Sequence, residues 1–116
     1  MAALSIDLLF TAAIRILLEE ERSITINCSL GEICIKFPTT RRLAEFLKVP
    51  HYYVLPYFAM MEEMELVTRA ERIGIFTTAN GTKKLVKMMC TDFRKEASEV
   101  IGEPLLAYLE ARVLSH

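Results

Sequence analysis

The stretch PTTRRLAEFLKVPHYYVLPYFAMMEEMELV, residues 38–67, decides the fold of this chain. Its first part predicts a short helix over residues 40–47, because apolar side chains recur there at helical spacing. The inner side of that helix is formed by Leu43, Ala44 and Leu47. Thr39 or Thr40 can accept a hydrogen bond from the first turn and so cap the helix.

A second helix is predicted over residues 51–64, after a tight connection at residues 48–50. Its inward positions by helical period are Val54, Tyr57 or Phe58, Met61 and Met64. Pro56 lies inside this range and lacks the N–H that would pair with the Tyr52 carbonyl. We therefore expect the helix to kink at Pro56 or to begin later than residue 51.

Upstream of this pair, residues 5–21 predict a helix that is apolar on all sides except one narrow polar stripe. Either the domain wraps this helix or a second subunit covers part of it. Residues 23–28 and 32–37 alternate in polarity, and Ser29-Leu30-Gly31 between them has turn chemistry, so they predict a β-hairpin.

Downstream, two strands are predicted at residues 66–71 and 75–78, joined by a turn at residues 72–74. Thr78 is expected to cap a helix that runs through Met89. Two further helices are predicted at about residues 92–101 and 105–114, and Pro104 suits a first helical turn because its missing N–H costs nothing there.

This order of elements resembles that of a winged helix-turn-helix, and three pieces of sequence resemble the family in the same order. Residues 39–49 (TTRRLAEFLKV) are similar to the first motif helix, and residues 50–67 match its recognition helix, acidic tail and strand entry. Residues 77–85 (TTANGTKKL) resemble the T-x-x-G-x-x-L motif that opens the helix after the wing in MarR-like and archaeal-type regulators, with three residues instead of two between Gly81 and Leu85. Glu65 stands where the family usually has glycine.

The resemblance covers about residues 37–85 and implies an α+β, mainly α fold: a single winged-helix domain over residues 1–116, with an extra N-terminal β-hairpin. The motif and wing occupy residues 36–87. MarR-like proteins dimerise through their terminal helices, so segments 1–22 and 91–116 are the predicted homodimer interface. Their apolar side chains exceed what one small core covers, notably Leu105, Leu106, Leu109, Val113 and Leu114.

The charge of the chain is unevenly distributed along the sequence. The net charge of -1 excludes a uniformly basic nucleic-acid-binding surface. Residues 36–87 nevertheless hold nine basic and five acidic side chains, whereas the flanking segments hold five basic and ten acidic ones. This asymmetry favours an anionic partner for the centre of the chain.

The candidate DNA-binding residues are Arg41, Arg42, His51, Tyr52, Tyr53, Arg69 and Arg72. Arg41 and Arg42 fall in a first helical turn, where the helix dipole disfavours cations, so a phosphate docked there would bind the arginines and free N–H groups together. Arg69 and Arg72 belong to the predicted wing, which would follow the DNA backbone or minor groove. We predict a double-stranded-DNA-binding transcriptional regulator in which backbone contacts dominate.

The outward side of the second motif helix favours an alternative, a winged-helix adaptor that binds protein. That side presents Tyr52, Leu55, Pro56 and Met60, and the last three cannot hydrogen-bond the edges of bases. An exposed apolar face of this kind typically marks a protein partner.

The sequence offers little support for other classes of function. No motif of a known catalytic centre is present, and three cysteines without CxxC spacing plus two histidines make no zinc cluster, so we expect no enzyme, metal or cofactor. The cysteines are expected to be reduced, with a Cys28–Cys34 bridge as the alternative. Asp7 and Arg15 interrupt the apolar first segment, so we expect a cytoplasmic protein without a membrane span or secretory signal.

Overall fold

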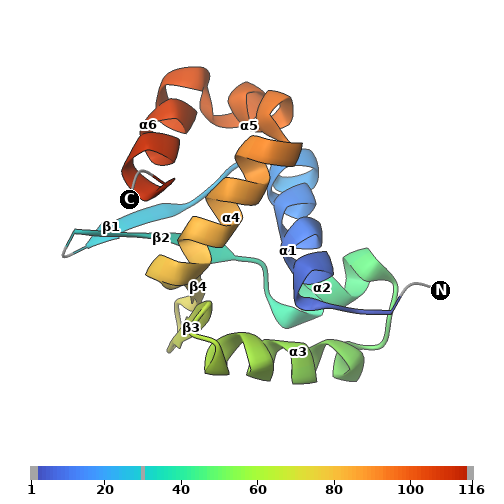
Figure 1. Cartoon of the computed structure of the whole chain (residues 1–116). Coiled ribbons are helices and arrows are strands. Elements are labelled where there is room, and N and C mark those ends of the chain that lie inside the picture. The colour runs from blue at the N-terminus through green and yellow to red at the C-terminus, as the bar shows by residue number, and fades with distance from the viewer. Residues whose placement is uncertain (1–2, 30, 115–116) are drawn as a thin grey trace.

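The structure is a computed structural model, and it describes residues 3–29 and 31–114. It is an α+β fold with mainly helical content (Figure 1). In chain order its elements are α1 (Ile6–Arg15), the π-helical η1 (Ile16–Glu21), β1 (Ile26–Ser29), β2 (Glu32–Phe37), α2 (Thr40–Leu47), α3 (His51–Glu63), β3 (Val67–Ala70), β4 (Gly74–Thr77), α4 (Ala79–Asp92), α5 (Arg94–Ile101) and α6 (Glu103–Leu114). The predicted order of helices and strands is confirmed.

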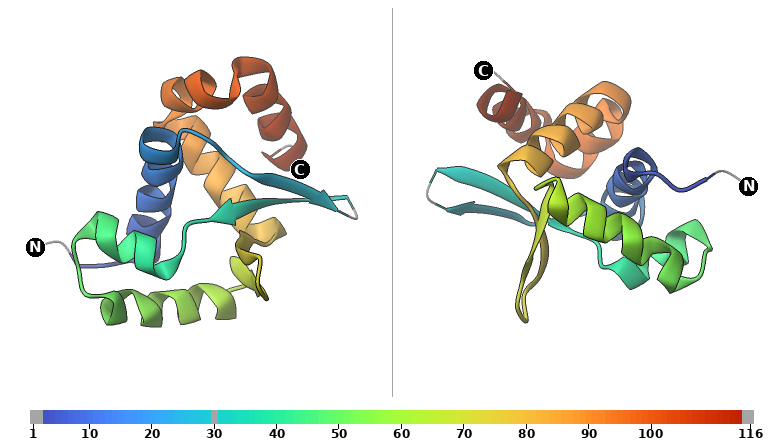
Figure 2. Two further views of the ribbon diagram at one scale, coloured as in Figure 1. Left: turned by 180° about the vertical axis from the view of Figure 1, so that it is seen from behind. Right: turned by 60° about the horizontal axis from the view of Figure 1, so that its bottom comes forward.

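The four strands form one antiparallel sheet in the order β1-β2-β4-β3. β1 and β2 form the predicted hairpin, with Ile26 opposite Ile35 and Ser29 opposite Glu32. β2 pairs with β4 only at its end, where Lys36 faces Phe76 and Phe37 faces Ile75. The rest of the β1–β2 hairpin therefore extends beyond β4 as an arm, which projects to one side in both views of Figure 2.

Two buried threonines hydrogen-bond the backbone of β2 in the arm, where β4 does not pair with it. The Ile35 N–H donates to Thr77 Oγ1 at 2.8 Å, and the Thr77 and Thr82 hydroxyl oxygens are 2.6 Å apart. Thr82 Oγ1 in turn lies 2.6 Å from the Ile33 carbonyl oxygen, to which it donates. The two hydroxyls thus satisfy backbone groups that would otherwise be buried without partners.

The hydrophobic core is one cluster to which nearly every element contributes. Phe37 of β2 packs edge to face on Phe10 of α1 and on Phe58 of α3, with ring centroids 5.2 and 5.9 Å apart. Leu43 and Phe58 are fully buried, so the prediction that the motif helices converge on one core is confirmed.

Helix α1 is enclosed by its own chain. It contacts α2 and α4, and η1 contacts α5, so Leu9, Ala13 and Ile14 have no exposed surface. Of the two alternatives, the domain wraps this helix. The argument that the first helix exceeds what one core can cover was therefore wrong, because the carboxy-terminal helices fold back over it.

Two expectations about α3 are also wrong. The helix begins at His51 and continues through Pro56, so of the two alternatives, a kink at Pro56 or a later start, the later start is wrong. Tyr52, whose carbonyl lacks the proline N–H, lies 66% exposed in the first turn, where water can bond that carbonyl. Met64 was predicted to face inward but is exposed, because α3 ends at Glu63 and Met64 caps it.

The alternative of a Cys28–Cys34 bridge is contradicted, because both thiols are free. Cys34 stands opposite Asn27 in the hairpin and shares its face. Because neighbouring residues of a strand point to opposite faces, Cys28 lies on the other face of the arm. The register thus keeps the two sulfur atoms apart.

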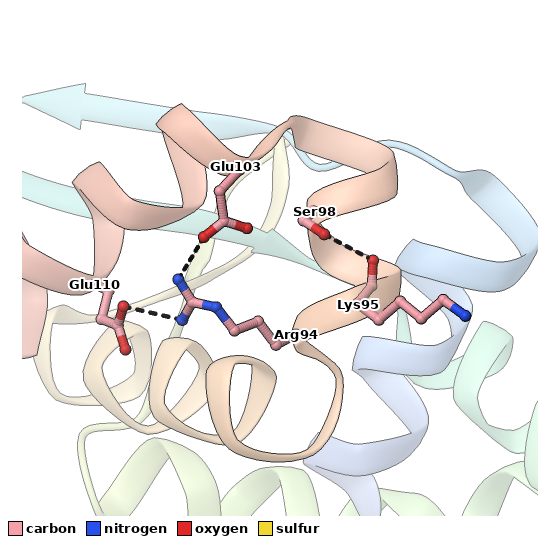
Figure 3. A network of polar contacts seen from close by, with 5 residues as sticks. All are labelled: Arg94, Lys95, Ser98, Glu103 and Glu110. Atoms are coloured by element: carbon pink, nitrogen blue, oxygen red, sulfur yellow. Dashed lines mark hydrogen bonds and ion pairs between the residues drawn. The ribbon is translucent and has the colours of Figure 1, made fainter.

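The carboxy-terminal helices are joined by one arginine (Figure 3). Arg94, at the start of α5, donates to Glu103 at 2.6 Å and to Glu110 at 3.0 Å, both on α6. These hydrogen bonds raise the pKa of the Arg94 guanidinium. Leu106 and Leu109 of α6 are buried, whereas Leu105 and Tyr108 are exposed.

Candidate binding surface of helix α3

The start of α3 is fixed to α2 by the connection at residues 48–50. Lys48 ends α2 in the left-handed conformation, with φ at 58°, and its N–H bonds back to the Glu45 carbonyl. The His51 Nε2 atom lies 2.7 Å from Thr40 Oγ1, which links the first turns of the two helices. These two contacts hold the amino end of α3 against α2.

The carboxy end of α3 is fixed by the residues that resemble T-x-x-G-x-x-L. Thr78 caps α4, as predicted, by accepting from the Gly81 N–H at 3.1 Å. A Cβ atom at Gly81 would lie 1.8 Å from the Leu66 carbonyl oxygen, so only glycine allows α4 to approach this close. Glu65 adopts φ of 57°, a left-handed conformation that glycine adopts at lower cost.

With both ends fixed, α3 lies at the edge of the molecule with one side uncovered. In Figure 1 no other ribbon lies on its outer side, and it lies in front when the bottom of the molecule comes forward in Figure 2. Val54, Phe58 and Met61 form its buried side. The outward side is the surface that sequence analysis singled out for binding.

The outward side of α3 is apolar over most of its length. We call Tyr52, Leu55, Pro56, Ala59 and Met60, all exposed, the α3 stripe. Tyr53 beside it is 45% exposed. Among the described residues, α3 thus carries four of the eight large apolar side chains that are exposed. Residues 51–61 contain no Asp, Glu, Lys or Arg, so nothing charged interrupts the stripe.

A groove lies next to the stripe, between α3 and the chain that precedes α1. It has a volume of about 460 Å³, and its walls include Leu4, Val49, Tyr53 and Pro56. The groove adds apolar surface on the Tyr53 side of the helix. An occupant of the stripe can therefore place an apolar side chain in this groove.

The structure separates the predicted basic residues into two groups. Arg42 forms an ion pair with Glu20 of η1, and Arg69 lies 3.3 Å from Glu62 of α3. Within residues 3–29 and 31–114, no ion pair involves Arg41, Lys48 or Arg72, and all three are exposed. Arg42 thus already has an ion-pair partner within the chain, whereas Arg41 beside it has none among the described residues.

The two ends of α3 differ in charge. Lys48 precedes the helix, and Pro50 at its start provides no capping side chain. At the other end Glu63 is exposed, and its carboxylate has no ion-pair partner among the residues that the structure describes. The surface along α3 therefore runs from a cation through an apolar middle to a carboxylate. This change of charge along α3 was not predicted from the sequence. The order of Lys48, the uncharged residues 51–61 and Glu63 would have indicated it.

Two thiols that belong to other elements, Cys34 on β2 and Cys90 on α4, have raised pKa values. Burial raises the pKa of the Cys90 thiol, and Glu110 adds to the effect. Burial also raises the pKa of Cys34, so both thiols hold less thiolate at neutral pH than a free cysteine. In the described part of the chain, no group of three or more His, Cys, Asp or Glu is placed to hold a metal ion. Among the same residues, no helix has the length and apolar character to cross a membrane.

Comparison with models of protein families, with curated proteins and with solved structures finds no match for this chain. Its function must therefore be argued from the surface of α3 and the residues around it.

Proposed function

We propose that the chain is a winged-helix adaptor that binds a protein partner through the α3 stripe. The winged-helix assignment is supported by the element order α2, α3, β3, β4, α4 and by the pairing of β2 with β4 beside the β3–β4 hairpin. The protein-binding function is supported above all by one observation, the uncharged exposed side of α3. A fold of this type is used for many functions, so the argument depends on the site.

Physical chemistry favours protein over DNA for this face. Base edges are recognised by hydrogen bonds, which Leu55, Pro56 and Met60 cannot make through their side chains. Burying the same side chains against an apolar partner releases water and contributes about 25 cal/mol for each Å² removed from solvent. The carboxylates of Glu62 and Glu63 at the end of α3 would also repel phosphates.

The test compares two double variants that change equal numbers of exposed apolar residues. Leu55→Ser with Met60→Ser alters the stripe, whereas Leu105→Ser with Tyr108→Ser alters α6. Immobilised wild-type and variant proteins are incubated with lysate of the source organism, and bound proteins are identified by mass spectrometry. We expect a partner that the wild-type protein and the α6 variant retain and the stripe variant loses. Identical sets of bound proteins on all three would contradict the proposal.

The second candidate is a cytoplasmic double-stranded-DNA-binding regulator that pairs as a homodimer through α5 and α6. It is favoured by the exposed cations Arg41, Lys48 and Arg72, which lie near the start of α3 and at the tip of the β3–β4 hairpin. Such binding would rest on backbone contacts, with His51, Tyr52 and Tyr53 at the helix tip adding modest specificity.

This candidate is tested by the salt dependence of DNA binding in a fluorescence anisotropy titration. Arg41→Ala with Arg72→Ala should flatten the slope of log K against log salt by about two units, because each phosphate contact contributes about 0.9. The control, Arg42→Ala with Arg69→Ala, removes arginines already paired with glutamates and should change the slope less. Absence of binding to any duplex at about 50 mM salt would contradict a DNA-binding function.

A further inference from the structure

We infer that the α3 stripe binds a second copy of this chain, with the two α3 helices antiparallel about a two-fold axis near Pro56. This inference rests on the proposed function, since it names a partner for the same stripe. A two-fold interface brings one surface patch against itself, so that patch must be complementary to its own rotated copy. Shape and charge along α3 both meet this requirement.

The shape of the stripe is complementary to itself in the antiparallel arrangement. With Pro56 at the axis, Tyr52 lies opposite Met60 of the partner subunit, and Ala59 lies opposite Tyr53 of the partner subunit. Pro56 and Ala59, which are flat or small, lie in the middle beside Leu55, and the large side chains of Tyr52 and Met60 lie toward the ends. Two such helices can approach closely at the centre, while each Tyr52 packs beside a flexible methionine.

The charges are complementary in the same arrangement. Glu63 falls at the level of the start of the partner's α3, next to the connection that contains Lys48 of the partner subunit. The start of that helix has no capping side chain and carries the positive end of the helix dipole. A parallel arrangement would instead bring Glu63 against Glu63 and Lys48 against Lys48.

The α3 stripe has a stronger claim to self-association than the exposed residues of α6. Leu105 and Tyr108 are 40% and 55% exposed, but the nearby carboxylates of Glu103 and Glu110 are already bound by Arg94 of the same chain. Lys48, just before α3, and Glu63, at its end, have no ion-pair partner among the described residues. Of these two helices, α3 is thus the one that has an apolar middle with unpaired charges of opposite sign beside its two ends.

The experiment measures the molar mass of the full chain by sedimentation equilibrium from micromolar to several hundred micromolar concentration. We expect a monomer–dimer equilibrium for the wild-type protein. Lys48→Glu and Glu63→Lys should each weaken dimerisation about tenfold, because each places like charges at two symmetric positions. The double variant, which carries both changes, should regain most of the wild-type dimerisation, since it exchanges the two side-chain signs but leaves a lysine near the positive end of the partner's helix dipole. Far-ultraviolet circular dichroism checks that each variant is folded.

Two further variants distinguish a dimer that forms through α3 from one that forms through α6. Ala59→Glu places a carboxylate in the middle of the stripe and should abolish the dimer, whereas Tyr108→Glu on α6 should leave it intact. The inference is overturned by a wild-type monomer over the whole range, by loss of the dimer in Tyr108→Glu alone, or by a double charge variant that stays as weak as the single ones. If the protein is a monomer but still captures a partner that depends on the stripe, only this inference is contradicted. If the protein is a dimer but captures no such partner, only the adaptor function is contradicted.

Discussion

Helices α1 and α3 are both apolar nearly all round, yet the chain encloses one and leaves the other half uncovered. α1 lies between α2, α4 and β2, and Ile14 near its carboxy end has no exposed surface. α3 lies at the edge and contacts the core through one row of side chains, while Leu55 on its other side is 40% exposed. An apolar circumference therefore predicts that a helix will be covered, but position in the fold decides whether its own chain covers it.

The largest expected effect tests the enclosed helix. Ile14→Ala removes a fully buried side chain from α1, and the surrounding helices can relax only in part. We expect a loss of about 2–5 kcal/mol in the free energy of unfolding. Urea denaturation followed by circular dichroism measures this loss.

The matched substitution on the exposed helix is Leu55→Ala, and its stability is measured at micromolar protein concentration. Its effect should stay within about 0.5 kcal/mol, because the side chain already contacts water. Equal losses for the two variants would contradict the comparison and show that Leu55 is covered. A loss for Leu55→Ala that grows with protein concentration would indicate that a second copy covers it.

Helix α4 covers α1 and also bonds the arm through Thr82. A substitution at Thr82 should have an intermediate effect on the free energy of unfolding. Thr82→Val keeps the shape of the side chain but removes the hydroxyl that donates to the Ile33 carbonyl. That carbonyl and the Thr77 hydroxyl lose a buried partner, so we expect a loss of about 1–3 kcal/mol in the free energy of unfolding. Thr68→Val on the exposed side of β3 is the control and should change stability little. A loss of equal size in both variants would mean that the hydroxyl is not the cause.

The smallest effect concerns Glu65, which follows the end of α3 in a left-handed conformation. Glu65→Gly should raise the free energy of unfolding by about 0.5 kcal/mol, because glycine adopts the positive φ at lower cost. Glu63→Gly makes the same chemical change inside the helix and should lower stability by about 0.5 kcal/mol. Thermal unfolding of both variants measures the difference, and a shift of the same sign in both would refute the argument.

Local patterns in the sequence predicted most of the fold. The helix at residues 40–47 was predicted with its bounds, and Thr78 was predicted as a cap, because spacing and capping depend on near neighbours. The exposure of Leu55 and Met60 also followed from helical phase. The outward side of the candidate site was thus predictable before its neighbours were known.

What could not be predicted depends on contacts between distant residues. Glu20 pairs with Arg42 across 22 positions, and no local pattern shows that this glutamate balances that arginine. Thr82 likewise appeared as an ordinary helical residue, because its bond to Ile33 spans 49 positions. The burial of α1 by the carboxy-terminal half also depends on contacts between residues that are far apart in the sequence.

The threonine pair that holds the arm also has a consequence for the order of folding. Ile35 and Thr77 are 42 positions apart, whereas the contact between Thr40 and His51 spans only 11. Closing the longer loop costs more chain entropy, so the α2–α3 pair should form early and bring the ends of the sheet together. Contacts made late leave the folding rate nearly unchanged and slow unfolding instead. We therefore expect the Thr77–Thr82 pair mainly to slow unfolding, with Φ-values near zero at Thr82 and higher values at Leu43.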